Sequence, residues 1–194
     1  TLSPSSAASD VYKRQPLEPQ VELIKTIIPD VKSIGFVYSP GEVNSTIVLK
    51  QLQDILAQDN IKVVPAPAQR TTDIPTAVKS LQGRVDVIYT STDNNVVSAY
   101  ESMYQAAVQT KIPLIASDTS SAERGAAAAL GGDYYGMGRQ TGKIVVRILN
   151  GEKAGDIPSE KPQKTELYVN LKAAEQQGVT LPQVVIDNAT KVIK

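Results

Sequence analysis

Three short segments of the sequence carry side chains that could bind a small polar molecule. They are SPGEVNS (39–45), TSTDNN (90–95) and SDT (117–119), and each follows an apolar run. Their hydroxyl, amide and carboxylate groups offer both donors and acceptors of hydrogen bonds. Such a set suits recognition of a small solute through hydrogen bonds and charge.

Composition excludes most catalytic chemistry for these segments. The 194 residues include no Cys and no His, so thiol nucleophiles, Cys/His zinc sites and imidazole bases are impossible. A G-x-S-x-G motif is also absent. Lys plus Arg and Asp plus Glu both number 20, with no basic stripe of the kind that neutralises phosphates. We therefore expect no enzyme activity, no metal or cofactor and no nucleic-acid partner.

The elements that must position these segments alternate between helix and strand. Short apolar, β-rich runs predict strands over 33–38, 61–64, 85–89 and 113–116. Apolar residues at helical spacing lie between them, including a helix over 97–108. Nearly uniformly apolar strands separated by helices indicate a parallel sheet covered on both faces, which right-handed crossovers make doubly wound. The sequence predicts an α/β fold.

The carboxyl ends of parallel strands meet at one edge of a sheet, and ligands bind there in this class of fold. We expect the three polar segments to lie together at that edge. The alternative is that Asn44, Asn94 and Thr119 only cap helices, as such residues do in many proteins.

The pattern changes after Asp118. A small-residue strand over 126–130 leads into GGDYY (131–135) and a long helix, and a further strand over 164–170 follows. The long helix, predicted over 135–150, has four apolar residues on one face: Ile144, Val145, Ile148 and Leu149. The tail after the helix at 173–177 is weakly patterned.

Five stretches, in this order and spacing, resemble one protein family: IGFVYSPGEVNS (34–45), VDVIYTSTDNNVVSA (85–99), KIPLIASD (111–118), GAAAALGGDYYGMGRQTG (125–142) and VNLKAAEQQGVTLP (169–182). The chain resembles ABC-transporter substrate-binding proteins with a type I periplasmic-binding-protein fold. The better-understood members of this family take tryptophan, tyrosine or phenylalanine.

The resemblance implies a two-lobed clamp that holds an amino acid between its lobes and delivers it to a membrane permease. Residues 16–130 would form the second lobe, residues 131–160 a crossover and a remnant helix of the first lobe, and residues 161–194 a return strand and helix on the second lobe, with the C-terminal tail. The apolar face of the remnant helix should then be exposed. The resemblance also implies an N-terminally truncated chain whose location is periplasmic or extracytoplasmic and membrane-anchored. Neither a signal peptide nor a transmembrane run is visible.

The first segment, residues 1–15, has neither helical nor strand periodicity. It resembles translated sequencing-adapter read-through, and the alternative is a disordered native terminus.

A bound amino acid would need donors for its carboxylate. Ser39, Asn44 and Ser45 lie where a helix N-terminus also offers free N–H groups, which suits a carboxylate. Glu42 would repel a carboxylate, so we expect it to face the ammonium group or solvent.

The ammonium group would need acceptors. Asp93 and Asp118 are the natural partners, supported by Thr92 and Asn94, and Tyr134 or its neighbour could stack on an aromatic side chain. The alternative is that Asp118 caps a helix and that the tyrosines pack between the lobes.

Three other classes remain as alternatives. A flavodoxin-like receiver or carrier domain would end with its fifth strand and helix, whereas this chain continues through a lone helix and a return strand. The ligand-sensing effector domain of a repressor, or an extracytoplasmic sensor, would share the fold. Gly136, Gly138 and Gly142 faintly match a dinucleotide-binding fingerprint, but two tyrosines stand where a strand must immediately precede it, and Asp156, the acidic residue about 20 positions later, lies in a predicted loop.

Overall fold

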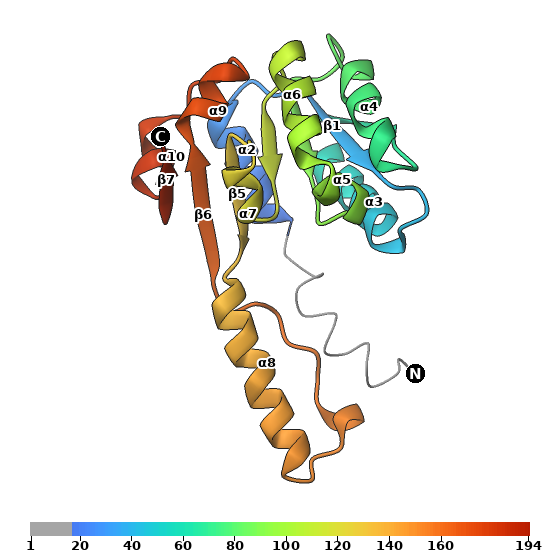
Figure 1. The fold of residues 1–194 in the computed structure, drawn as a ribbon, viewed down its shortest axis with the longest axis vertical. Helices are drawn as coiled ribbons and strands as arrows, with labels where there is room; N and C mark the ends of the chain where they lie inside the picture. The colour runs from blue at the N-terminus through green and yellow to red at the C-terminus, as the bar shows by residue number, and fades with distance from the viewer. Residues whose placement is uncertain (1–16) are drawn as a thin grey trace.

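The computed structural model describes residues 17–194, and our expectation for residues 1–15 lies outside them. Within this range one sheet has the strand order β2-β1-β3-β4-β5-β6-β7 (Figure 1). Its strands are β1 (Ser33–Tyr38), β2 (Lys62–Pro67), β3 (Val87–Thr90), β4 (Leu114–Ala116), β5 (Ala128–Gly132), β6 (Thr165–Asn170) and β7 (Lys191–Ile193).

The first five strands pair in parallel, which confirms the expected α/β fold of the type I periplasmic-binding class. The sequence did not indicate that β6 runs antiparallel to β5. Strand β7, in the weakly patterned tail, adds parallel to β6. The sheet is therefore mixed at one side and parallel through the part that carries the polar segments.

Helices cover both faces of the sheet. The helices over residues 17–194 are α2 (Glu18–Ile27), α3 (Val43–Ala57), α4 (Ile74–Ser80), α5 (Asn94–Ser98), α6 (Tyr100–Thr110), α7 (Ser120–Glu123), α8 (Tyr134–Leu149), α9 (Leu171–Gln176) and α10 (Gln183–Asp187), with single 3₁₀ turns at Thr71–Asp73 and Ala154–Asp156. One hydrophobic cluster joins the sheet to α4, α5, α6 and α7, and a second joins it to α2, α3, α9 and α10.

Burial explains the pattern of the strands. All four residues of β3 are buried, as a central strand covered on both faces requires. Strand β2 alternates between exposed and buried residues and contains Pro65 and Pro67, which an edge strand tolerates because one side of its backbone needs no partner.

The helix predicted over 97–108 is two helices, so that boundary was wrong. Helix α5 ends at Ser98 and α6 begins at Tyr100, with Ala99 between them outside helical geometry (φ −107°, ψ 22°). A one-residue break leaves the apolar spacing nearly intact, so periodicity alone does not reveal it.

Helix α8 extends beyond the sheet, and an extended segment returns beside it to β6 (Figure 1). Three of the four apolar residues predicted on its exposed face are exposed: Val145 (47%), Ile148 (40%) and Leu149 (79%). Ile144 is half-buried, and Val146 is exposed as well. Only Met137 and Gln140 of this helix are buried.

Gln177 fastens the C-terminal region back onto the sheet layer. Its side chain is fully buried, its Oε1 accepts the backbone N–H of Leu114 at 2.6 Å and its Nε2 donates to the carbonyl of Gly125 at 2.7 Å. No helix within the described range has both the length and the apolar character needed to cross a membrane.

Candidate ligand-binding edge

The loops that follow β1, β3 and β4 lie side by side at the carboxyl edge of the sheet, because these strands are neighbours and parallel. They contain the three polar segments. The Ser117 amide donates to the carbonyl of Thr90, which connects the second and third loops directly. The expected gathering of the segments at one edge is therefore present.

Asp93 lies at the centre of this edge and is fully buried. Its carboxylate accepts five hydrogen bonds, from Ser39 N (2.7 Å), Ser39 Oγ (2.8 Å), Ser45 Oγ (2.6 Å), Asn95 N (3.0 Å) and Val96 N (3.1 Å). The last two bonds make Asp93 the N-cap of α5. The first two come from Ser39, in the loop after β1, and the third comes from Ser45 in the first turn of α3, so one side chain ties the loop after β3 to both.

Ser39 and Ser45 are also buried, and both hydroxyl groups point at Asp93. Each hydroxyl has one hydrogen, and donation to the carboxylate uses it. The Ser39 oxygen in addition accepts the side-chain amide of Asn95 at 2.9 Å. These hydroxyls, as placed, have no hydrogen left for a ligand carboxylate.

Glu42 reaches in the opposite direction, from the first loop to the second. Its two carboxylate oxygens accept the backbone N–H of Asn94 at 3.0 and 3.3 Å. The Asn44 amide lies at 3.5 Å from Glu42 Oε2, the outer limit of a hydrogen bond. The first N–H groups of α5 are thus all taken by carboxylates.

Asp118 follows β4 and is 6% exposed. Its Oδ2 accepts the hydroxyl groups of Ser120 (2.5 Å) and Ser121 (3.3 Å). No hydrogen bond from a residue between 17 and 194 reaches its Oδ1. Asp118 therefore retains an acceptor oxygen, which Asp93 does not.

The remaining predicted residues line the same edge. Thr92 is half-buried and the side chain of Asn94 is exposed. Tyr134 begins α8, which follows the carboxyl end of β5, and is 48% exposed.

Two residues of this edge were not singled out from the sequence. Asn95 joins three loops, because its amide donates to Ser39 Oγ and to the carbonyl of Gln69 at 3.0 Å. Gly131 lets the Asp118 loop approach β5, since a Cβ there would lie 2.6 Å from the carbonyl oxygen of Ser117. The glycine pair at 131–132 was the available signal for Gly131.

Two buried tyrosines, Tyr89 in β3 and Tyr100 at the start of α6, have neutral hydroxyl groups near this edge. Burial raises the pKa of Tyr89, against a hydrogen bond with Ser117 that lowers it. Burial likewise raises the pKa of Tyr100, opposed by hydrogen bonds with Thr90 and Ser121. Both phenols stay protonated in the physiological range, so the formal charges on these loops are those of the carboxylates.

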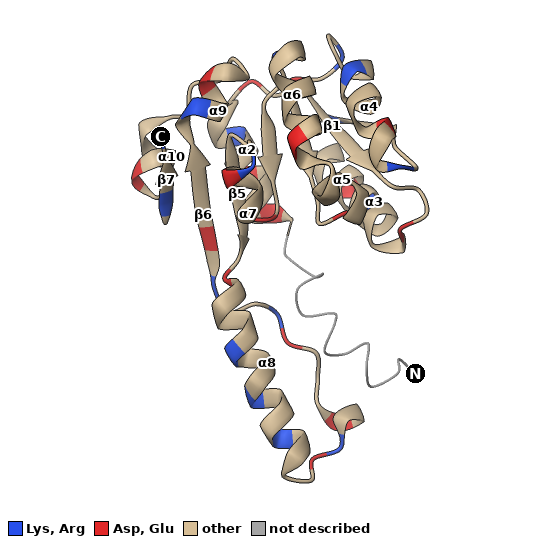
Figure 2. Ribbon diagram, in the orientation of Figure 1, with Lys and Arg blue, Asp and Glu red and all other residues tan. Residues whose placement is uncertain are grey.

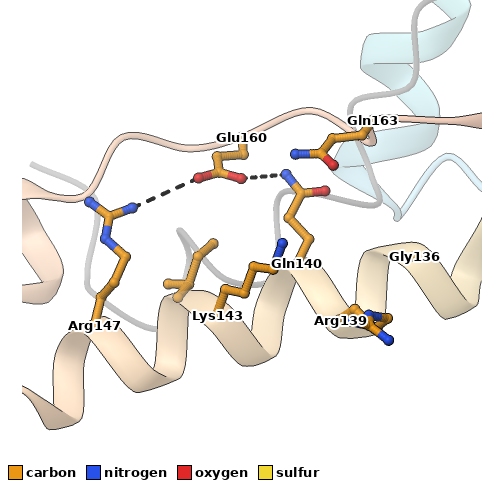
Figure 3. A pocket seen from close by; sticks show the side chains of 8 residues that line it. Gly136, Arg139, Gln140, Lys143, Arg147, Glu160 and Gln163 are labelled. Carbon is orange, nitrogen blue, oxygen red and sulfur yellow. Dashed lines mark hydrogen bonds and ion pairs between the residues drawn. The ribbon is translucent and has the colours of Figure 1, made fainter.

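A cavity of about 330 Å³ lies elsewhere, between α8 and the returning segment. Gln140 and Arg147 point from α8 toward Glu160 (Figure 3). Arg147 also forms an ion pair with Glu152 at 2.5 Å. Figure 2 shows basic residues spaced along α8, with both acidic and basic residues on the segment beside it. None of the predicted ligand-binding residues lines this cavity. Across residues 17–194 no group of acidic side chains is arranged to hold a metal ion.

Comparison with known proteins identifies relatives over most of the chain. A tyrosine-binding protein of Clostridioides difficile (strain R20291) is 35% identical over 171 residues, which cover 87% of this chain and 50% of that protein. The structure of a conserved domain protein from Vibrio cholerae has 44% identity and a TM-score of 0.86, covering 91% of this chain and 60% of that one. An ABC domain from Streptococcus pneumoniae in complex with L-Trp has 30% identity and a TM-score of 0.83, covering 93% and 62%.

The chain thus spans about half the length of the curated relatives that it matches. The family model described as ABC transporter substrate binding protein matches residues 3–193, nearly the whole sequence. The fold agrees with that match, and the chain belongs to the ABC transporter substrate-binding protein family.

Proposed function

We propose that this chain is part of the solute-binding component of an ABC importer, which captures an aromatic amino acid between two lobes and delivers it to a membrane permease. The observation that carries the proposal is similarity over 93% of the chain to a domain that binds L-Trp. The tyrosine-binding relative supports the same class of ligand. Capture and release need no chemical step, so the proposed protein is not an enzyme.

The carboxyl edge supplies groups of the right kind for an amino acid. We assign the ammonium group to Asp118, whose Oδ1 has no hydrogen-bond donor among the described residues, with Thr92 and Asn94 of the neighbouring loop in support. We assign the ligand carboxylate to the first turn of α3 and to Asn44. Helix α3 has no side-chain cap, and its first N–H groups find no acceptor within residues 17–194. We assign Tyr134, at the start of α8, to stacking on an aromatic ligand.

The proposed clamp also accounts for the exposed face of α8. Residues 16–130 and 161–194 would form one lobe, and residues 131–160 would cross to the other and return. An apolar helix face is stable when another element covers it. The exposed fractions of Val145, Val146 and Leu149 support the assignment of α8 to a second lobe. Such a protein would work outside the cytoplasmic membrane, either anchored to it or in the periplasm.

Calorimetric titration of the full-length protein that contains this chain, against individual L-amino acids, tests the proposal. We expect one-to-one binding of L-tryptophan, L-tyrosine or L-phenylalanine, with glycine and L-glutamate as controls that do not bind. Binding of none of the aromatic amino acids would reject the proposed ligand class. The family match gives no support to a repressor-type sensor.

A further inference from the structure

Two carboxylates at the binding edge, one from each of two neighbouring loops, accept hydrogen bonds from donors on the other side. Asp93 belongs to the loop after β3 and accepts three bonds from Ser39 and Ser45, in and after the loop that follows β1. Glu42 belongs to the loop after β1 and accepts the first N–H of α5. Ser39 and Asp93 are 54 residues apart in the sequence. These bonds join the two loops into one hydrogen-bonded unit.

The carboxylate of Asp93 has no capacity left for a ligand. Two carboxylate oxygens provide about four lone-pair sites, and five donors already point at them. Its side chain is also fully covered. A ligand ammonium group would have to displace existing bonds and enter a buried space to reach it.

We propose that Asp93 is a positioning residue, which holds the first turn of α3 against the loop after β3 and so sets the geometry of the binding edge. The proposal rests on the proposed function for its link to amino-acid binding. Glu42 assists by holding the start of α5. Ser45 is the connection between Asp93 and α3, because it belongs to the first turn of that helix and its hydroxyl bonds to Asp93.

The matched control is Asp86, at the opposite end of the same strand. Its Oδ2 accepts Lys32 N, Ser33 N and Ser33 Oγ at 2.8 to 2.9 Å, so it also ties β3 to the chain entering β1. Asp86 lies at the amino edge and is exposed. Loss of its carboxylate should loosen that edge and leave ligand binding unchanged.

The first test compares two ligands that differ by the ammonium group. In the full-length protein, Asp93→Asn should weaken binding of L-tyrosine about 10- to 100-fold, because buried donors lose their acceptor. The same loss should appear for 3-(4-hydroxyphenyl)propionate, which has no ammonium group. A loss seen with L-tyrosine and absent with the analogue would overturn the proposal, since it would show direct contact with the ammonium group.

The second test needs no ligand. Hydrogen exchange of the Ser39, Asn95 and Val96 amides should become at least about tenfold faster in Asp93→Asn, whereas Asp86→Asn should accelerate exchange only at Lys32 and Ser33.

A third test combines two variants. Ser45→Ala should weaken L-tyrosine binding, and the double variant with Asp93→Asn should lose little affinity beyond Asp93→Asn alone. Unchanged exchange, or fully additive losses, would reject the positioning role. If the wild-type protein binds no aromatic amino acid, the exchange result still decides this proposal separately.

Discussion

The sheet layer and helix α8 contrast in how they use apolar residues. In the sheet layer the large apolar side chains of the central strands are fully buried between two layers of helices. In α8 the apolar side chains form an exposed stripe, and the covered side faces a charged segment that contains Glu160. The same residue types therefore form the interior of one region and an exposed surface in the other.

Truncation of a large apolar side chain should lower the free energy of unfolding far more in the sheet layer than in α8, and this is the largest expected difference between the two regions. Phe36 is fully buried, with ring centroids 5.8 Å from Tyr38 and 6.1 Å from Tyr89. Phe36→Ala should lower the free energy of unfolding by about 3–5 kcal/mol. Leu149→Ala in this chain should change it by no more than about 0.5 kcal/mol, because the side chain is 79% exposed. Urea denaturation of both variants measures the difference.

The same pair tests the lobe assignment. In the full-length protein a first lobe that covers α8 would bury Leu149, and Leu149→Ala should then cost about 2–5 kcal/mol. An effect near zero in both proteins would contradict the assignment of α8 to another lobe.

Loss of the hydrogen bonds that attach the C-terminal region to the sheet should have the next largest effect on stability. Gln177→Leu keeps a similar volume but leaves the Leu114 N–H and the Gly125 carbonyl without their partner. Each buried group left unpaired costs about 1–3 kcal/mol. Thermal unfolding followed by circular dichroism measures the loss, with Gln183→Leu on the exposed part of α10 as the control. Equal melting temperatures for the two variants would show that Gln177 is not an anchor.

Two glycines should respond in opposite directions. Gly131→Ala places a Cβ 2.6 Å from a backbone oxygen in the Asp118 loop, so we expect a loss of about 1–3 kcal/mol and weaker ligand binding. Gly138 lies in α8 with no atom within 4 Å of a Cβ, so Gly138→Ala should stabilise this chain by about 0.5–1 kcal/mol. The midpoints of denaturant unfolding of the two variants, each compared with the unaltered chain, measure these changes in stability. Destabilisation by Gly138→Ala in this chain would mean that α8 is already covered.

The smallest effect concerns a surface ion pair of the sheet layer. Both guanidinium bonds from Arg124 to Glu101 are 2.6 Å long, and they lower the pKa of Glu101 to about 2. A lowered pKa in the folded state means that this stabilisation is complete above the unfolded value of about 4.5 and is lost as pH falls toward 2. The pair is exposed, so its contribution should stay within about 1 kcal/mol. Glu101→Gln should match wild-type stability near pH 2 and fall below it at pH 6, and a constant difference across that range would contradict the linkage.

Much of the molecule could be predicted from local pattern. Nearly uniformly apolar runs such as 85–89, in which Asp86 is the exception, indicate buried parallel strands, because a strand covered on both faces hides side chains of both orientations. Polar residues directly after those runs must reach the same sheet edge, which is how Asp93 and Asp118 were found. The exposed stripe on α8 also follows from its own spacing together with the resemblance to two-lobed proteins.

The tertiary structure alone decided how those polar groups pair. Ser39 and Ser45 suit a ligand carboxylate by residue type, yet both hydroxyls point inward to Asp93 from 54 and 48 residues away. The antiparallel direction of β6 and the presence of β7 likewise depend on partners distant in sequence. Periodicity reports which face of an element is buried, because burial repeats along the chain. The partner of a hydrogen bond depends on which loops the strand order brings together, and that information is not local.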